Sequence, residues 1–143
     1  MDSTKRYFIS NNTRVACVQA LSFPEGIKDA WDKIFATVPS QQERKFYGIS
    51  YGGENGKIIY RAGAEELYQG EAEQLGLKTF IVKQGEYIYE LLEDWRKDET
   101  QIGKVFNELL NDAHIDKKVG YCLEIYFNAT DVLCLVKLDP SAK

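Results

Sequence analysis

The sequence predicts an α+β domain made of two β-α-β-β units related by a pseudo-twofold axis, with an antiparallel sheet packed on two helices and a central ligand cleft. Three observations support this fold class. One extended, one helical and two further extended patterns follow one another in the same order in residues 14–67 and 77–138. Each half contains one amphipathic helical pattern and ends in two extended segments joined by a polar turn. The length of 143 residues suits a single domain over 1–143 that contains both halves.

The first half opens with a β-branched and apolar segment at 14–21, which is typical of a strand. A helix is expected next, with Pro24 in its first turn and its end at 39–42. Strands at 45–51 and 57–63 follow, joined by a turn that contains Asn-Gly, a strong hairpin signal. The apolar residues of the helix recur at three- and four-residue spacing: Ile27, Ala30, Trp31, Ile34, Phe35 and Val38.

The second half repeats this order. Extended segments at 77–83 and 86–92 are separated by a bend or bulge at Gly85. A second helix is expected to begin near Asp98, and its apolar face carries Ile102, Val105, Phe106, Leu109 and Leu110. Two strands close the unit, at 121–127 and 132–138.

Between the halves, residues 69–74 are polar and are predicted to be a linker. The halves overlay in pattern, with 47–51 matching 123–127, although few residues are identical. In this overlay Gly48 takes the place of Glu124. We therefore expect space opposite the Glu124 carboxylate, in a cleft where the halves meet.

The composition is that of an ordinary globular protein, with 44% hydrophobic and 28% charged residues. The net charge of −4 argues against direct nucleic-acid binding. The sequence shows neither an apolar signal core nor a segment of the ~20 apolar residues that a bilayer span needs. We expect a cytoplasmic protein that does not bind a membrane.

The metal-binding and nucleophilic residue types are sparse. Cys17, Cys122 and Cys134 are an odd set without CxxC spacing, and they lie among strand residues. His114 is the single histidine, which argues against a histidine metal site or a catalytic triad. No metal and no cofactor are predicted, and the cysteines are expected to be reduced and to pack as small apolar residues.

Glu124 is the most informative residue, because it stands alone in the apolar strand 121–127. That strand holds no Lys or Arg, and a charged side chain is rarely buried without a partner. Alternation places Glu124 on one face with Cys122 and Tyr126. The opposite face, expected to pack on the helices, carries Leu123, Ile125 and Phe127. Glu124 is either an anchor for a cationic ligand or a hydrogen-bonded structural carboxylate.

Five short motifs follow one another along the chain, at 31–35, 47–51, 60–65, 85–87 and 123–126. Together they resemble the GyrI-like small-molecule-binding domain family, which occurs alone and as the effector-binding part of AraC- and MerR-type regulators. The resemblance covers about residues 14 to 138, and it implies the duplicated β-α-β-β fold. No DNA-binding domain is expected, since the 13 residues before the first strand are too few for a helix-turn-helix.

The resemblance also implies a site. In that family an acidic residue on the penultimate strand lies among aromatic residues and often accepts lipophilic cations, and Glu124 matches its position. Tyr60 and Tyr126 are the best matches to the aromatic walls, although both could be ordinary strand tyrosines. Phe46, Tyr51 and Trp95 complete the candidate ligand-binding set. Trp31, on the helix stripe, is assigned to the core.

Three functions follow from the resemblance and from Glu124. The first is a stand-alone binding module for amphipathic or cationic small molecules, acting in drug or toxin sensing or sequestration. The second is a hydrolase of cyclopropane-containing genotoxic natural products, with Glu124 as the catalytic residue. The third is a gyrase-modulating interaction protein. A homodimer is a further prediction for its assembly.

Overall fold

A computed structural model describes residues 5–39, 43–53, 56–112, 114–118 and 120–141 of the chain. Its strands are β1 Lys5–Ile9, β2 Thr13–Gln19, β3 Phe46–Gly52, β4 Ile58–Glu65, β5 Lys78–Val82, β6 Gly85–Leu92, β7 Tyr121–Tyr126 and β8 Val132–Lys137. Its helices are α1 Ile27–Thr37, α2 Glu71–Gln74, the short 3-10 helix η2 Trp95–Lys97 and α3 Thr100–Leu109. The predicted helix end at 39–42 and the predicted Asn-Gly turn include positions 40–42 and 54–55, which lie outside the described residues.

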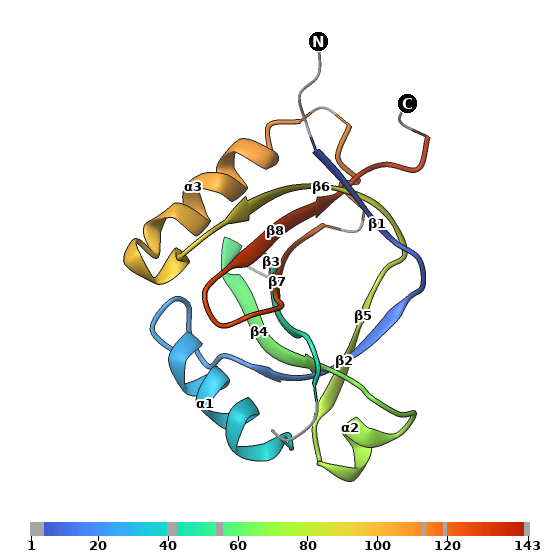
Figure 1. The fold of residues 1–143 in the computed structure, drawn as a ribbon, viewed down its shortest axis with the longest axis vertical. Coiled ribbons are helices and arrows are strands. Elements are labelled where there is room, and N and C mark those ends of the chain that lie inside the picture. The colour runs from blue at the N-terminus through green and yellow to red at the C-terminus, as the bar shows by residue number, and fades with distance from the viewer. Residues whose placement is uncertain (1–4, 40–42, 54–55, 113, 119, 142–143) are drawn as a thin grey trace.

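The strands form one antiparallel sheet in the order β1-β6-β8-β7-β3-β4-β2-β5. The sheet curls strongly, and α1 and α3 lie on its outer side (Figure 1). The α+β class and the two β-α-β-β units are therefore confirmed: β2-α1-β3-β4 and β6-α3-β7-β8. The predicted bend at Gly85 separates β5 from β6, and this glycine has a φ of 132°.

Each unit is preceded by a strand that pairs with the other unit. β1 pairs with β6, and β5 pairs with β2, so the leading strands are exchanged between the halves. β1 was not predicted, and the first predicted strand begins at residue 14. As an edge strand with only intermediate and exposed side chains, β1 carries a weak apolar signal.

The two faces of the sheet have separate cores. On the concave face Leu123 and Ile125 belong to a cluster with residues from strands that do not pair with β7, among them Val15, Val82 and Tyr87. The expectation that this face packs on the helices was wrong. The curl brings the two ends of the sheet toward each other, so the concave face is covered by the sheet itself. Phe127, predicted for the same face, lies beyond the end of β7 and is 45% exposed.

The helices cover the convex face, which carries Glu124. α1 packs on β4 and β2, and α3 packs on β8 and β6, which leaves the central strands β3 and β7 between them. α1 begins at Ile27, three residues later than Pro24, because 22–26 form a turn in which Gly26 N–H donates to Ser22 O over 3.1 Å. No helix in the described ranges is long and apolar enough to cross a membrane.

The predicted linker is ordered and partly buried. It contains α2, and the side chain of Glu71 is only 3% exposed. Both Glu71 oxygens accept hydrogen bonds from the Arg44 guanidinium over 3.0 Å, and Oε1 also accepts the Leu67 N–H over 2.9 Å. The Arg44 hydrogen bonds lower the pKa of Glu71. The linker was predicted from its polar sequence. The Glu71 charge is nevertheless buried, because it forms an ion pair with Arg44.

This pair generates a prediction about stability. Arg44→Met leaves the Glu71 carboxylate buried without its cation, and we expect the free energy of unfolding to fall by about 3–5 kcal/mol. Urea denaturation measures the change. The double variant Arg44→Met/Glu71→Met should regain much of the loss, and Lys28→Met, which breaks the exposed Lys28–Asp32 pair, should change little. A double variant less stable than Arg44→Met would contradict this account.

Candidate functional site

Three residue pairs on the convex face run along the boundary between the two halves. Partners across β3 and β7 lie directly opposite each other, so both side chains of a pair point to the same face. The middle pair joins the two residues that the sequence overlay equated, so the pseudo-twofold axis passes between them. In order along the strands the pairs are Phe46–Tyr126, Gly48–Glu124 and Ser50–Cys122.

Glu124 lies in the middle pair and is 7% exposed. Its Oε1 accepts hydrogen bonds from Tyr60 OH over 3.0 Å and from Tyr126 OH over 2.5 Å. Among the described residues, no Lys, Arg or His forms an ion pair with Glu124, and no hydrogen bond reaches Oε2. The carboxylate is therefore held by neutral donors only, on one of its two oxygens.

Gly48 makes room for this arrangement. A Cβ atom at position 48 would collide with Glu124 Oε1 and with Tyr60 OH. The two polar groups thus occupy the volume that any other residue at 48 would fill. The expected space opposite Glu124 exists, and in this conformation the Glu124 and Tyr60 side chains occupy it.

Burial determines the protonation of the site. It raises the pKa of Glu124, and the hydrogen bonds from Tyr126 and Tyr60 offset only part of that effect. The pKa values of both tyrosines are also raised, first by burial and then by the Glu124 charge. Both phenols therefore stay protonated at neutral pH and donate to the carboxylate.

An aromatic shell surrounds the phenols. The Trp31 indole N–H donates to Tyr60 OH over 3.1 Å, and the same ring meets Tyr126 edge-on with 5.4 Å between centroids. The Trp95 ring approaches Tyr126 equally closely, at 5.4 Å. Phe46 packs on Phe35 at 5.1 Å. The site is thus filled at the Phe46–Tyr126 end by ring contacts from α1, β3, β7 and η2.

The structure brings together most of the predicted site residues. Tyr60 and Tyr126 contact Glu124 directly, and Phe46 and Trp95 belong to the surrounding shell. Tyr51 does not join them, since its ring stacks on Phe80, in the concave core, and its hydroxyl accepts a hydrogen bond from Arg61.

Trp31 is the residue that sequence reasoning missed. Its place on the apolar helix stripe indicated a core residue, and its burial is only partial. The available signal was the indole N–H, which needs a hydrogen-bond acceptor when it is turned inward. That acceptor is Tyr60 OH, which places Trp31 one hydrogen bond away from Glu124.

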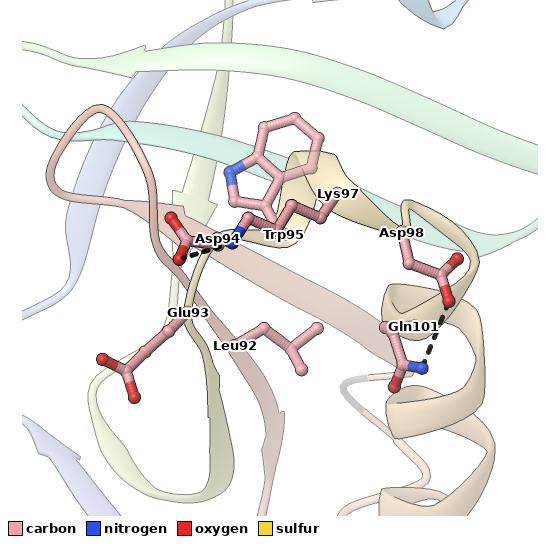
Figure 2. Close-up of a pocket in the computed structure, with 7 residues that line it drawn as sticks. All are labelled: Leu92, Glu93, Asp94, Trp95, Lys97, Asp98 and Gln101. Atoms are coloured by element: carbon pink, nitrogen blue, oxygen red, sulfur yellow. Dashed lines mark hydrogen bonds and ion pairs between the residues drawn. The ribbon is translucent and has the colours of Figure 1, made fainter.

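A pocket of about 280 Å³ lies outside the aromatic shell, beside Trp95 (Figure 2). Its acidic residues have local partners: Asp94 pairs with Lys97 at 3.7 Å, and Asp98 accepts hydrogen bonds from Thr100 and Gln101. In Figure 2 the Glu93 side chain points away from the Trp95 indole. Asp94 and Asp98 are thus accounted for by the turn at η2 and by the start of α3, where Asp98 accepts the Thr100 N–H.

The three cysteines lie at buried or partly buried positions. Burial raises the pKa of Cys122 to about 11 and also raises the pKa values of Cys17 and Cys134, so these thiols stay protonated at neutral pH. In the part of the chain that the structure describes, no group of three or more His, Cys, Asp or Glu residues is placed to hold a metal ion.

The fold and the site define a small α+β domain with a buried carboxylate among aromatic side chains, at the junction of two similar halves. No protein-family model and no curated protein sequence matches this chain. Solved structures do match it in fold. SAV2435 bound to tetraphenylphosphonium is 9% identical with a TM-score of 0.69, over 97% of this chain and 95% of that one.

Two further structures share the fold. An integron cassette protein from the mobile metagenome of Vibrio cholerae is 15% identical with a TM-score of 0.62, over 95% of each chain. A putative bacterial transcription regulation protein from Staphylococcus aureus MU50 is 8% identical with a TM-score of 0.55, over 96% of this chain and 99% of that one. At these identities the likeness shows the fold alone.

The contact at Gly48 yields a prediction. Gly48→Ala should destabilise the protein by about 1–3 kcal/mol, because the new methyl group displaces the Glu124 carboxylate or the Tyr60 phenol. Chemical denaturation measures the loss. Gly52→Ala is the matched control on the same strand, since a Cβ atom there meets nothing within 4 Å. Equal stabilities of the two variants would contradict the close packing at Gly48.

The raised pKa of Glu124 predicts a pH dependence of stability. The folded protein holds the Glu124 proton more tightly than the unfolded chain, whose carboxyl pKa is about 4.3. This stabilisation is complete below that pKa and is lost as pH rises through the higher folded-state pKa. The free energy of unfolding of the wild type should therefore fall over that interval relative to Glu124→Gln, which cannot titrate.

Denaturant unfolding of both proteins at a series of pH values measures this difference. The other carboxylates are common to the two proteins, so their titration cancels when the free energies are subtracted. A difference that stays constant with pH, or that grows in favour of the wild type as pH rises, would show that the pKa of Glu124 is not raised.

Proposed function

We propose that this protein is a binding module for lipophilic cations, with Glu124 as the anionic anchor. We also infer that it is a GyrI-like effector-binding domain, on the basis of its motifs and its fold. The observation that carries the proposal is the buried Glu124 carboxylate, which two neutral phenols hold and no basic side chain of the described residues neutralises. A cationic ligand would supply the missing charge.

The physical argument starts from the free energy of a buried charge. Burial disfavours the ionised form of Glu124, and the raised pKa expresses that penalty. A cation beside the carboxylate reverses the preference, because opposite charges attract strongly where water is excluded. Aromatic rings add attraction for a cation over their faces, worth about 0.5–2 kcal/mol for each contact. The shell of Trp31, Trp95, Tyr60 and Tyr126 offers such rings.

The structural comparison supports the choice of ligand class. SAV2435, with the same fold, was solved bound to tetraphenylphosphonium, a lipophilic cation. With 9% identity this does not transfer a ligand to the present chain. It does make tetraphenylphosphonium a reasonable first probe.

A second candidate function, hydrolysis, has one observation in its favour. A carboxylate with a raised pKa is better matched to proton transfer near neutral pH, and here it lies beside the hydroxyl groups of Tyr60 and Tyr126. Glu124 could then activate water for attack on a strained electrophile. Product formation beyond one equivalent of protein, lost in Glu124→Gln, would establish turnover. The gyrase partner, the homodimer and the cytoplasmic location stay predictions.

The central prediction concerns cation affinity. Tetraphenylphosphonium should bind the wild type, and Glu124→Gln should weaken binding at least tenfold, or about 1.4 kcal/mol, because the neutral amide cannot balance the ligand charge. The two tryptophans of the sequence both contact Tyr126, so intrinsic fluorescence reports binding at this site. Affinity should also rise with pH, up to tenfold per pH unit below the pKa of Glu124.

Glu90→Gln is the matched control. Glu90 is an exposed carboxylate on β6, one strand beyond Cys134, the β8 partner of Glu124. Like Glu124→Gln, the Glu90→Gln substitution removes one negative charge from this row of the sheet, but it leaves the residues around Glu124 unchanged. Equal weakening by both substitutions would mean that net charge, rather than a buried anchor, governs binding, and would overturn the proposal.

A further inference from the structure

The convex face opens into a second pocket at the end opposite the aromatic shell. This pocket, of about 360 Å³, has the Ser50–Cys122 pair in its lining. Its volume falls in the range of about 300–1,000 Å³ typical of small-molecule sites. It is bounded by the end of α3 at Leu110, by 115–117 and by the ends of β3 and β7.

The pocket adjoins the buried carboxylate along the sheet. Ser50 and Cys122 are two residues from Gly48 and Glu124 on the same faces of the same strands, a separation of about 7 Å. Gly48 lies between Phe46 and Ser50 on the same face of β3, and the Glu124 carboxyl and the Tyr60 hydroxyl pack over it. Tyr60, the β4 partner of Ser50, sends its hydroxyl to Glu124 over 3.0 Å. The Tyr60 side chain thus extends from the position beside Ser50 to the Glu124 carboxylate.

The lining of the pocket suits an apolar ligand group. Ile58, Leu110, Ile115 and Val136 contribute aliphatic surface, and Ser50 and Cys122 are small and uncharged. The charged residues of the lining, Asp116 and Lys117, have opposite signs and contribute no net charge. Attraction for a cation would therefore come from Glu124.

The other direction is closed. At the Phe46–Tyr126 end, the rings of Trp31 and Trp95 each lie 5.4 Å from Tyr126, so a bulky group could enter only by displacing them. The pocket beside Trp95 has Asp94 and Asp98 in its lining, and these carboxylates already pair with Lys97 and Gln101. Of the two pockets, only the one at Ser50–Cys122 has a lining residue next to Glu124 on its own strand face.

We propose that the Ser50–Cys122 pocket is the subsite for the apolar body of the ligand, whose cationic centre faces Glu124. This inference rests on the proposed cation-binding function and adds where the ligand lies. It makes Leu110, Ser50 and Cys122 determinants of ligand size. Tyr51 borders the pocket, but its ring stacks on Phe80 on the concave face.

The first test fills the pocket. Leu110 is 45% exposed at the end of α3, so Leu110→Trp can add volume without disturbing a buried core. It should weaken tetraphenylphosphonium binding at least tenfold, measured by calorimetry. The control is Leu67→Trp, at a 38% exposed leucine outside the pocket, which should bind like the wild type. Wild-type affinity in Leu110→Trp would overturn the proposed subsite.

The second test uses the wild-type chain and the natural thiol of the pocket. Cys122 is partly exposed, whereas Cys17 and Cys134 are buried. At alkaline pH, where part of the Cys122 thiol is ionised, methyl methanethiosulfonate forms a mixed disulfide with the thiolate and releases methanesulfinate. Mass spectrometry follows the labelled protein. Tetraphenylphosphonium should slow labelling of Cys122 with a half-maximal concentration equal to its dissociation constant. Cys122→Ser supplies the blank.

The outcomes separate the two proposals. Binding that depends on Glu124 but leaves Cys122 labelling unchanged would place the ligand elsewhere, and would overturn the subsite while preserving the cation-binding function. Absence of tetraphenylphosphonium binding to the wild type would overturn both. Protection of Cys122 together with loss of binding in Leu110→Trp is the result expected.

Discussion

The pairing of β3 with β7 is the constraint on which the molecule depends, because it joins the two halves and places Gly48 opposite Glu124. A larger residue at 48 would exclude the carboxylate or the Tyr60 phenol from this position. The helices pack mainly to either side of this junction, α1 on β4 and β2 and α3 on β8 and β6. The space that the Glu124 carboxylate occupies thus lies at the pseudo-twofold axis.

Two carboxyl groups in this chain are buried in different electrostatic surroundings, and their pKa values shift in opposite directions. Glu71 meets the Arg44 guanidinium through two hydrogen bonds, and its pKa is lowered. Glu124 meets only phenolic hydroxyls, and its pKa is raised. The first arrangement is complete within the protein and anchors α2 to the chain before β3. The second is complete only with a proton or a cation, which is the expected property of a binding site rather than a structural pair.

The two similar halves of the chain differ from each other at the proposed binding site. The two halves contribute equivalent strands to the centre, yet one supplies glycine and the other glutamate, so a single charge faces a single space. The ends of the central row differ as well. Aromatic rings from both halves fill the Tyr126 end, while small residues leave the Cys122 end open. A symmetric framework thereby holds an asymmetric site that could orient a ligand with a charged centre and an apolar body.

Local patterns in the sequence were enough to predict both β-α-β-β units, the two main helices and the isolation of Glu124 on a face with Tyr126. These features depend on residues two to four positions apart, and the spacing of apolar residues along the sequence indicates them. Only the tertiary structure decided that the helices cover the Glu124 face, that β1 and β5 are exchanged between the halves, and that Tyr51 lies apart while Trp31 joins the site. The curl of the sheet and the pairing of distant strands determine these, and both arise from contacts between segments that no local pattern connects.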